Sequence, residues 1–238
     1  MYFFYAENIL IDDTIVLDRE ESRHCIRSLR KKTGDQVYVT DGKGALFLAE
    51  ITDDNMNQTL LKRIRQTEAP YPKKHHLRMA VSPLKNPDRF EWFVEKPVEI
   101  GIDEIIPIVC PRTEKSQLKL ERLNRIALAA MKQSMKTVLP KIQEPIKIKD
   151  FLYASTEQET KVIAWCETSK EKGIQEILGN STNISILIGP EGDFTKEEVD
   201  LAMGQGFIPV SLGPSRFRSE TAAVLACHHA FLAQNEKL

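Results

Sequence analysis

The chain has 238 residues, of which 42 % are hydrophobic and 28 % charged, with a formal net charge of −1. This composition is too apolar for a disordered chain, and the overall charge predicts neither nucleic-acid nor membrane binding. The start lacks a secretory signal, no apolar run approaches the roughly 18 residues of a membrane span, and the four cysteines form no C-x-x-C pair. We therefore expect a globular, cytoplasmic protein with reduced thiols.

The first part of the chain reads as a small β-barrel. Short alternating runs occur at residues 14–17, 36–40, 45–51 and 60–64, separated by the turn sequences TGD and DGKG. Residues 68–74 (EAPYPKK) then contain two prolines, which disfavour regular structure, and mark a domain boundary. The sequence thus predicts one domain at residues 1–70 and a second at residues 73–238.

Residues 18–32 (DREESRHCIRSLRKK) predict a short helix that is capped by Asp18 and Glu21. Arg23, Arg27 and Arg30 fall at i, i+4 and i+7 on one side of this helix, and Lys31 is next to Arg30. Three other residues face the opposite side, toward the barrel: Cys25, Ile26 and Leu29. A basic stripe is usually only a solvated face, and Glu20 and Glu21 dilute this one, so the pattern alone does not predict RNA contact.

From residue 77 onward, short apolar runs alternate with helical patterns of ten or more residues. The runs lie at residues 77–81, 105–110, 162–166, 184–188 and 208–212. Helices are predicted to begin at Pro87, at the capping box that starts with Thr195, and near Ser219, and a further amphipathic pattern covers residues 120–131. This alternation predicts an α/β domain with a parallel sheet that helices cover.

A glycine-containing turn follows the apolar run at residues 184–188. The sequence IGPEGDFT leads into the helix that begins at Thr195, and Gly189 and Gly192 would let the backbone approach a ligand closely. A single turn of this kind is more often an ordinary connection between a strand and a helix. The run at residues 208–212 is followed in the same way by GPSRFRSETA, and a helix N-terminus there would attract a ligand carboxylate.

The second of these segments also has a plain structural reading. Arg216 and Arg218 can be a surface pair, while Ser219 and Glu220 can be a helix cap with an acid in the first turn. Two strand ends of this type in one sheet nevertheless make a ligand site plausible, because the carboxyl ends of parallel strands meet at one edge.

Together these segments resemble the RsmE-type methyltransferases of small-subunit ribosomal RNA, in the SPOUT class. That family has I-G-P-E-G after a strand and a later L-G-x-R-x-L-R-x-E-T-A. This chain matches the first at residues 188–192 and the second at residues 212–213, 218 and 220–222, whereas Ser215 replaces the first arginine and Arg216 follows it. Further similarity at residues 24–35, 96–107, 133–134 and 140 extends the resemblance along the whole chain. Pro97 is a second departure and should interrupt a helix.

The resemblance implies a PUA-like β-barrel followed by a SPOUT domain with a C-terminal trefoil knot, and a homodimer. It also implies that S-adenosylmethionine is the methyl donor for a uridine N3 of 16S ribosomal RNA in the assembled small subunit. No metal and no membrane would take part.

The resemblance also suggests roles for individual residues. Arg218 is expected to stabilise the negative charge on the deprotonated base. Glu220 is expected to orient Arg218 or to cap the helix, and a role as a base ranks lower. The expected cofactor residues lie at three strand ends: Glu167, Ile188, Gly189, Pro190, Glu191, Gly192, Leu212, Gly213, Phe217 and Thr221. The expected RNA-binding residues are Arg23, Arg27, Arg30 and Lys31.

Other interpretations remain open at this stage. A SPOUT enzyme could act on a different RNA, and Ser215 is compatible with a non-catalytic ribosome-binding or assembly factor. A dinucleotide-binding oxidoreductase is disfavoured because the chain has no G-x-G-x-x-G sequence. The pairs His75-His76 and His228-His229 lack partners at metal-ligand spacing, so we assign them structural roles.

Overall fold

The computed structural model describes residues 2–7, 9, 12–71, 75–154, 158–168, 173–179 and 181–235. The chain divides into two compact units, and each contains two segments of the sequence. The first unit comprises Met1–Lys73 and Leu128–Leu139, and the second comprises Lys74–Ala127 and Pro140–Leu238. Residues 72–74 of the expected boundary lie outside the described residues, and none of the described helices is long and apolar enough to cross a membrane.

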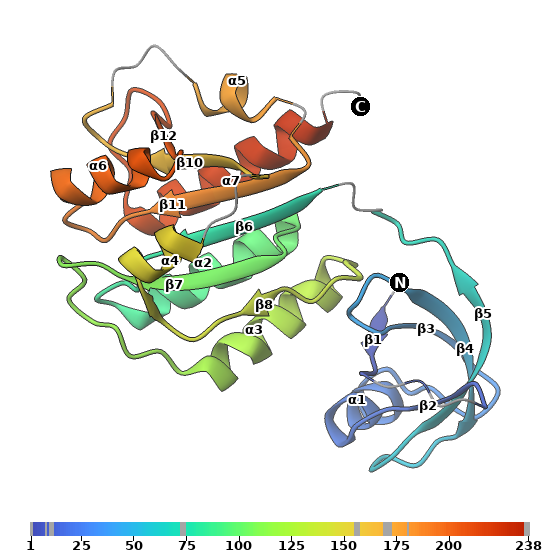
Figure 1. Ribbon diagram of the computed structural model, residues 1–238. Helices are drawn as coiled ribbons and strands as arrows, with labels where there is room; N and C mark the ends of the chain where they lie inside the picture. The colour runs from blue at the N-terminus through green and yellow to red at the C-terminus, as the bar shows by residue number, and fades with distance from the viewer. Residues whose placement is uncertain are drawn as a thin grey trace. The chain divides into compact units, whose positions relative to one another are not determined.

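The first unit is built on a curled five-stranded sheet (Figure 1). Its strands are β1 (Phe3–Tyr5), β2 (Thr14–Val16), β3 (Gln36–Thr40), β4 (Leu46–Asp53) and β5 (Leu60–Thr67), in the order β1-β3-β4-β5-β2. Alternation in β3 and β4 directs Val37, Val39, Ala49 and Ile51 into a common core. The four strands predicted in this region are confirmed, whereas β1, which pairs in parallel with β3, was not predicted.

The predicted basic helix is less regular than expected. It consists of α1 (Arg19–Arg23) followed directly by a π-helical turn, η1 (His24–Ser28). Asp18 caps it as predicted, since its carboxylate accepts from the Glu21 amide at 2.8 Å. The expected i, i+4, i+7 stripe is wrong at its last position, because the helix has ended before Arg30, which has a left-handed backbone (φ 54°).

The two faces of this segment differ in burial. Cys25 is fully buried in the first unit's core, where Ile26 and Leu29 pack against it, as predicted. Glu21 does not dilute the basic face as expected, because its side chain is buried. The Glu21 carboxylate accepts from the Tyr5 amide at 3.0 Å and pairs with the Lys132 ammonium.

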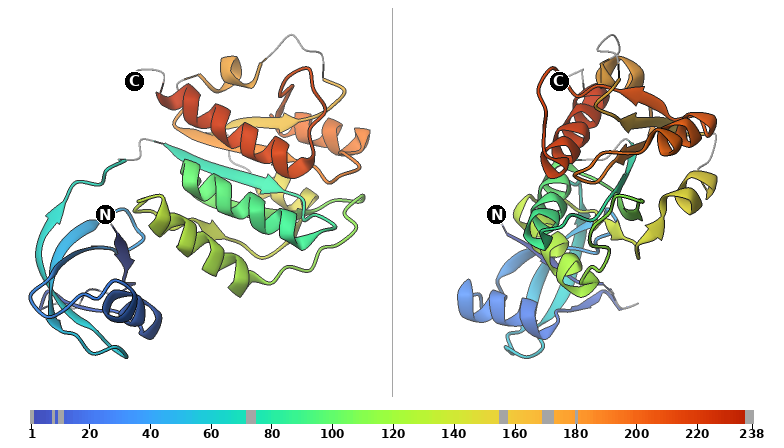
Figure 2. Two further views of the ribbon diagram at one scale, coloured as in Figure 1. Left: turned by 180° about the vertical axis from the view of Figure 1, so that it is seen from behind. Right: turned by 90° about the vertical axis from the view of Figure 1, so that its left-hand side faces the viewer.

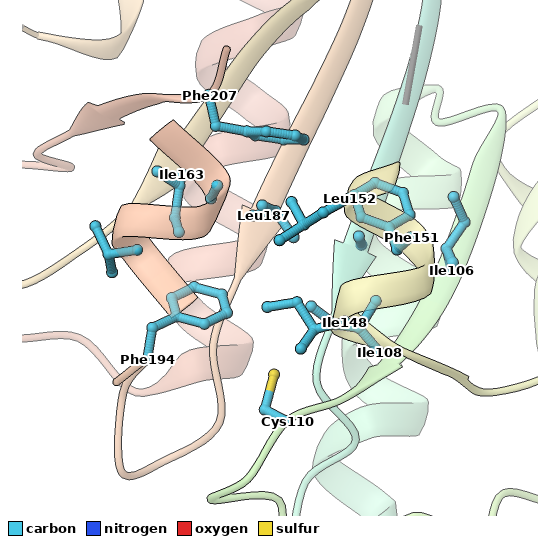
Figure 3. Packing of buried hydrophobic residues seen from close by; sticks show 13 residues of the cluster. Ile106, Ile108, Cys110, Ile148, Phe151, Leu152, Ile163, Leu187, Phe194 and Phe207 are labelled. Atoms are coloured by element: carbon cyan, nitrogen blue, oxygen red, sulfur yellow. The ribbon is translucent and has the colours of Figure 1, made fainter. Parts of the chain in front are cut away.

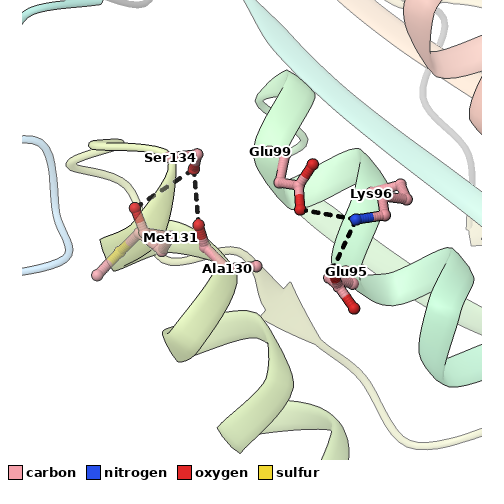
Figure 4. Close-up of polar contacts among 6 residues, drawn as sticks. All are labelled: Glu95, Lys96, Glu99, Ala130, Met131 and Ser134. Carbon is pink, nitrogen blue, oxygen red and sulfur yellow. Dashed lines mark hydrogen bonds and ion pairs between the residues drawn. The ribbon is translucent and has the colours of Figure 1, made fainter.

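Residues 128–139 are attached to the sheet of the first unit by hydrogen bonds. The Thr137 carbonyl accepts from the Gly44 amide at 2.9 Å and from the Thr40 hydroxyl at 3.1 Å. At the end of α3 (Leu120–Gln133), the Ser134 hydroxyl donates to the Ala130 carbonyl at 2.7 Å and to the Met131 carbonyl at 3.4 Å (Figure 4). The same two carbonyls also accept from the amides of Ser134 at 2.9 Å and Lys136 at 3.0 Å, so the hydroxyl adds to the hydrogen bonds that close this helix end.

The second unit contains a parallel sheet in the order β12-β10-β11-β6-β7-β8, with β9 also paired to β7. The strands are β6 (His76–Val81), β7 (Glu104–Val109), β8 (Lys141–Ile142), β9 (Ile146–Lys147), β10 (Thr160–Ala164), β11 (Asn183–Ile188) and β12 (Ile208–Val210). The five predicted strands are confirmed within a few residues at their ends. The predicted α/β fold with a parallel sheet is therefore confirmed.

Helices cover both faces of this sheet (Figure 2). One face carries α2 (Pro87–Ile100) and α7 (Ser219–Asn235), which pack against each other, with α5 (Ile174–Leu178) against α7. The other face carries α4 (Ile148–Ala154) and α6 (Lys196–Gly204). After β12 at the sheet edge, the chain returns as α7 across β11 and β6. The trefoil knot stays a prediction.

The predicted helix starts are confirmed, but one predicted break is wrong. Asn86 caps α2, and Thr195 and Glu198 form the predicted capping box of α6. The interruption expected at Pro97 does not occur, since α2 continues to Ile100 and Lys96 contacts both Glu95 and Glu99 (Figure 4). Pro97 lies in the last turn, where little helix remains to be disturbed.

A hydrophobic core fills the space between the sheet and the helices α4 and α6 (Figure 3). Ile148, Phe151 and Leu152 of α4 meet Leu187 of β11 there. Phe194, from the turn between β11 and α6, also enters this core and is only 2 % exposed. The turn is therefore fastened to the interior of the second unit.

Candidate functional site

A cavity of about 520 Å³ lies at the carboxyl ends of three adjacent strands, β10, β11 and β12. Its walls are the loops at residues 165–168, 189–194 and 211–217. The volume falls in the range of roughly 300–1,000 Å³ that small-molecule sites occupy, and the carboxyl edge of a parallel sheet is where such sites form. The cavity is therefore the candidate functional site.

The turn after β11 forms one wall of the cavity. It closes through a hydrogen bond from the Asp193 amide to the Pro190 carbonyl at 2.9 Å. A Cβ atom on Gly189 would lie only 3.1 Å from a ring carbon of Phe194, so a glycine fits here and a larger residue would press on the core. Gly189 and Gly192 both line the cavity without a side chain, so backbone forms this part of its wall.

Residues from the ends of two other strands hold this turn in place. The Glu191 carboxylate accepts from the Lys85 amide, beyond β6, at 3.0 Å. The Arg112 guanidinium, from the loop after β7, donates to the carbonyls of Gly192 at 2.7 Å and Phe194 at 3.3 Å. Arg112 itself lines the cavity. It was missed from the sequence because it is 80 positions away from Gly192 and belongs to no recognisable motif.

The loop after β10 forms the second wall. The Trp165 amide donates to the Val210 carbonyl of β12 at 3.3 Å, and the Cys166 amide donates to the Asp193 carboxylate at 3.2 Å. The Thr168 hydroxyl oxygen is buried and has no hydrogen-bond partner among the described residues. A buried polar atom of this kind at a cavity wall is available to a ligand.

Cys166 is the exposed member of the four cysteines. Desolvation, followed by the neighbouring Asp193 carboxylate, raises the pKa of its thiol above the usual value. The thiol therefore stays protonated at neutral pH and is a poor nucleophile beside the cavity.

The loop after β12 forms the third wall and leads into α7. Gly213 has a φ of 125°, which favours glycine, and the Ser211 hydroxyl accepts from the Gly213 amide at 3.3 Å. Ser215, Arg216 and Phe217 also line the cavity. Arg216 thus gives this wall a positive charge even though the preceding position is a serine.

Most of the predicted cofactor residues line this cavity. Those that do are Glu167, Ile188, Gly189, Pro190, Glu191, Gly192, Leu212, Gly213 and Phe217. Thr221, in the first turn of α7, is not among the lining residues. The structure therefore brings together residues that the sequence separates by about 50 positions, and their role as a cofactor site stays a prediction.

The two predicted catalytic residues lie beside the cavity rather than in its lining. Arg218 is exposed between the lining residues Phe217 and Ser219. Glu220 is only 7 % exposed, and one of its carboxylate oxygens lies 3.7 Å from Nε of Arg89 on α2. Its other oxygen is buried without a hydrogen-bond partner among the described residues. The sequence did not indicate Arg89, which is more than 100 positions away.

The predicted RNA-binding residues belong to the first unit. Arg23, Arg27 and Arg30 are exposed, and Lys31 is half-buried.

The histidine pairs raise the question of a metal site. The described part of the chain contains no group of three or more His, Cys, Asp or Glu side chains that could hold a metal ion.

Comparison with known proteins gives consistent matches over both units. Residues 71–230 match the model of an RNA methyltransferase domain, and residues 17–60 match that of an RNA methyltransferase PUA domain. The ribosomal RNA small subunit methyltransferase E of Rickettsia conorii is 31 % identical over 227 residues, which cover 93 % of this chain and 89 % of that protein.

Solved structures also resemble the chain over nearly its whole length. A probable rRNA-methyltransferase from Porphyromonas gingivalis is 36 % identical, with a TM-score of 0.91 and complete coverage of both chains. A ribosomal RNA small subunit methyltransferase E from Neisseria gonorrhoeae, solved bound to S-adenosyl methionine, is 26 % identical, with a TM-score of 0.84 and coverage of 96 % and 95 %.

Proposed function

Since the chain belongs to the ribosomal RNA small subunit methyltransferase E family, we propose that it transfers a methyl group from S-adenosylmethionine to a uridine N3 of 16S ribosomal RNA. The proposed substrate is the assembled small subunit, and the proposed site of action is the cytosol. We also propose that the chain acts as a homodimer, as the resemblance implies.

The observation that carries this proposal is the cavity at the ends of β10, β11 and β12. Its turn contains Gly189 and Gly192, which line the cavity without side chains, so backbone can face a ligand. The Thr168 hydroxyl oxygen is buried without a hydrogen-bond partner among the described residues, and the apolar side chains of Ile188 and Leu212 line the same space. These features fit a donor that combines a flat aromatic base with polar groups.

S-adenosylmethionine supplies an electrophilic methyl group on a cationic sulfonium. The protein's task is to position the two reactants and to control the proton on the uridine nitrogen, which is present at neutral pH. We propose that Arg218 stabilises the negative charge on the deprotonated base through guanidinium donors to its carbonyl oxygens. Glu220, next to Arg89, would fix the start of α7 and so orient Arg218.

RNA contact is assigned to the other part of the chain. We propose that residues 1–70 bind RNA through Arg23, Arg27, Arg30 and Lys31, and that residues 73–238 carry out the transfer. The positive charges of these four basic residues would neutralise RNA phosphates, so RNA binding should weaken as the salt concentration rises.

The test is methyl transfer from labelled S-adenosylmethionine to small subunits that lack the modification. Naked 16S RNA and transfer RNA are assayed in parallel, and the labelled nucleoside is identified after digestion. N3-methyluridine formed only in assembled subunits would support the proposal. Donor binding without labelled small subunits would indicate a different RNA, and no donor binding would favour a non-catalytic assembly factor.

A further inference from the structure

Asp193 has an unusual backbone conformation in the wall of the cavity. Its φ is 62°, in the left-handed region that glycine adopts freely and other residues adopt at a cost of about 1 kcal/mol or more. Aspartate tolerates this region better than most residues, because its short side chain can form local hydrogen bonds.

The Asp193 carboxylate joins two of the loops that line the cavity. One oxygen accepts from the Cys166 amide at 3.2 Å, and the other accepts from the Phe194 amide at 2.8 Å. Cys166 belongs to the loop after β10, and Phe194 ends the turn after β11 and is buried in the core. The carboxylate thereby ties the loop after β10 to a turn that the core already holds.

This contact lies where pairing between the two strands stops. The last register pair of β10 and β11 is Ala164 with Ile188, and the loops that follow these two strands line the cavity. On its other side, the loop after β10 is held to β12 by the bond from the Trp165 amide to the Val210 carbonyl. Asp193 supplies the corresponding restraint on the β11 side, just before Glu167 and Thr168.

We propose that Asp193 is a positioning residue for the methyl donor, which holds the loop at residues 166–168 against the turn at residues 189–192 in the binding-competent arrangement. This inference rests on the proposed function, because the cavity is taken to bind S-adenosylmethionine. Asp193 acts through the two loops, so its contribution concerns donor affinity and not the methyl-transfer step.

Two substitutions separate the side chain from the backbone. Asp193→Gly suits the left-handed backbone but removes both hydrogen bonds, whereas Asp193→Asn tolerates the same backbone and keeps one acceptor oxygen, which can serve only one of the two amides. Asp13→Gly is the matched control. Asp13 also has a left-handed backbone, with φ of 65°, and its carboxylate pairs with Arg63 in the first unit.

Donor binding is measured by calorimetric titration of each full-length variant with S-adenosylmethionine, together with melting temperature and steady-state kinetics on small subunits. We expect Asp193→Gly to raise the Kd and the KM for the donor by about five- to thirty-fold, as the loss of hydrogen bonds to an ionised group implies. Its kcat at saturating donor should stay within about twofold of the wild type. Its melting temperature should change little, because the relief of the left-handed backbone offsets the loss of the two hydrogen bonds.

The controls make the outcome specific. Asp193→Asn should not bind the donor more weakly than Asp193→Gly, since it keeps one of the two hydrogen bonds, and Asp13→Gly should leave donor binding unchanged. A wild-type Kd in Asp193→Gly would overturn the inference, and so would a loss of donor binding in Asp13→Gly as large as that in Asp193→Gly. If the wild-type protein bound no donor, the proposed function itself would fail, which is a distinct result.

Discussion

Replacing Gly189 by alanine should destabilise the second unit through one identifiable contact. The added Cβ would lie 3.1 Å and 3.2 Å from two ring carbons of Phe194, and 3.3 Å from its amide nitrogen. Carbon atoms pack best at about 3.5–4.0 Å, so the ring would have to move by several tenths of an ångström. Because Phe194 is 2 % exposed within the core, that movement would disturb its neighbours.

Overpacking of this kind costs about 1–3 kcal/mol. In a unit of this size, each kcal/mol lowers the melting temperature by about 2–4 °C, so calorimetry should detect the change. Phe194→Leu provides a second variant that vacates part of the space under Gly189. Gly204→Ala is the control, since a Cβ there would meet nothing within 4 Å.

The decisive quantity is the coupling between the two substitutions. If the ring causes the strain, the double variant Gly189→Ala/Phe194→Leu should be more stable than the sum of the single effects predicts, by about 1 kcal/mol. Additive losses would refute the reasoning, as would a Gly189→Ala variant as stable as Gly204→Ala.

Four other predictions concern different parts of the chain. Lys132→Ala should lower the free energy of unfolding of the first unit by about 2 kcal/mol, since it leaves the buried Glu21 carboxylate without its cation. Thermal unfolding measures this loss, and an unchanged melting temperature would contradict the prediction. Iodoacetamide should alkylate Cys166 more slowly than a free cysteine at pH 8, because the raised pKa of this thiol leaves less of the reactive thiolate. As the pH increases, the alkylation rate should rise with a midpoint above the usual thiol pKa. A midpoint at or below the usual thiol pKa would count against this prediction. Arg27→Ala should weaken binding to small subunits and make that binding less dependent on salt concentration. Arg218→Ala should still bind the methyl donor but lose methyl transfer. Normal turnover in Arg218→Ala would remove that residue from the mechanism.

Features that depend on neighbouring residues could be predicted from the sequence. Alternation identified β3, a continuous apolar run identified β11, and the capping box at Thr195 placed the start of α6 correctly. The glycine turn at residues 189–192 was recognisable for the same reason, because strand, turn and helix follow one another directly.

Features that depend on distant or very short segments could not be predicted. β8 and β9 have two residues each, too few to show a period. The π-helical turn at residues 24–28 has no pattern that distinguishes it from an α-helix. Arg112 and Arg89 reach their partners across the fold, and only the packing of parallel strands and helices brings them there.

The assignment of residues 128–139 to the first unit limits how this protein can be divided. The chain passes from one unit to the other three times, after residues 73, 127 and 139, so neither unit is an uninterrupted stretch of sequence. A fragment cut after residue 73 would lose Lys132 and expose the Glu21 carboxylate that it pairs with. Recombination that exchanged the amino-terminal part for that of another protein would have to carry residues 128–139 with it, so the two units should be inherited as a pair and not as interchangeable modules.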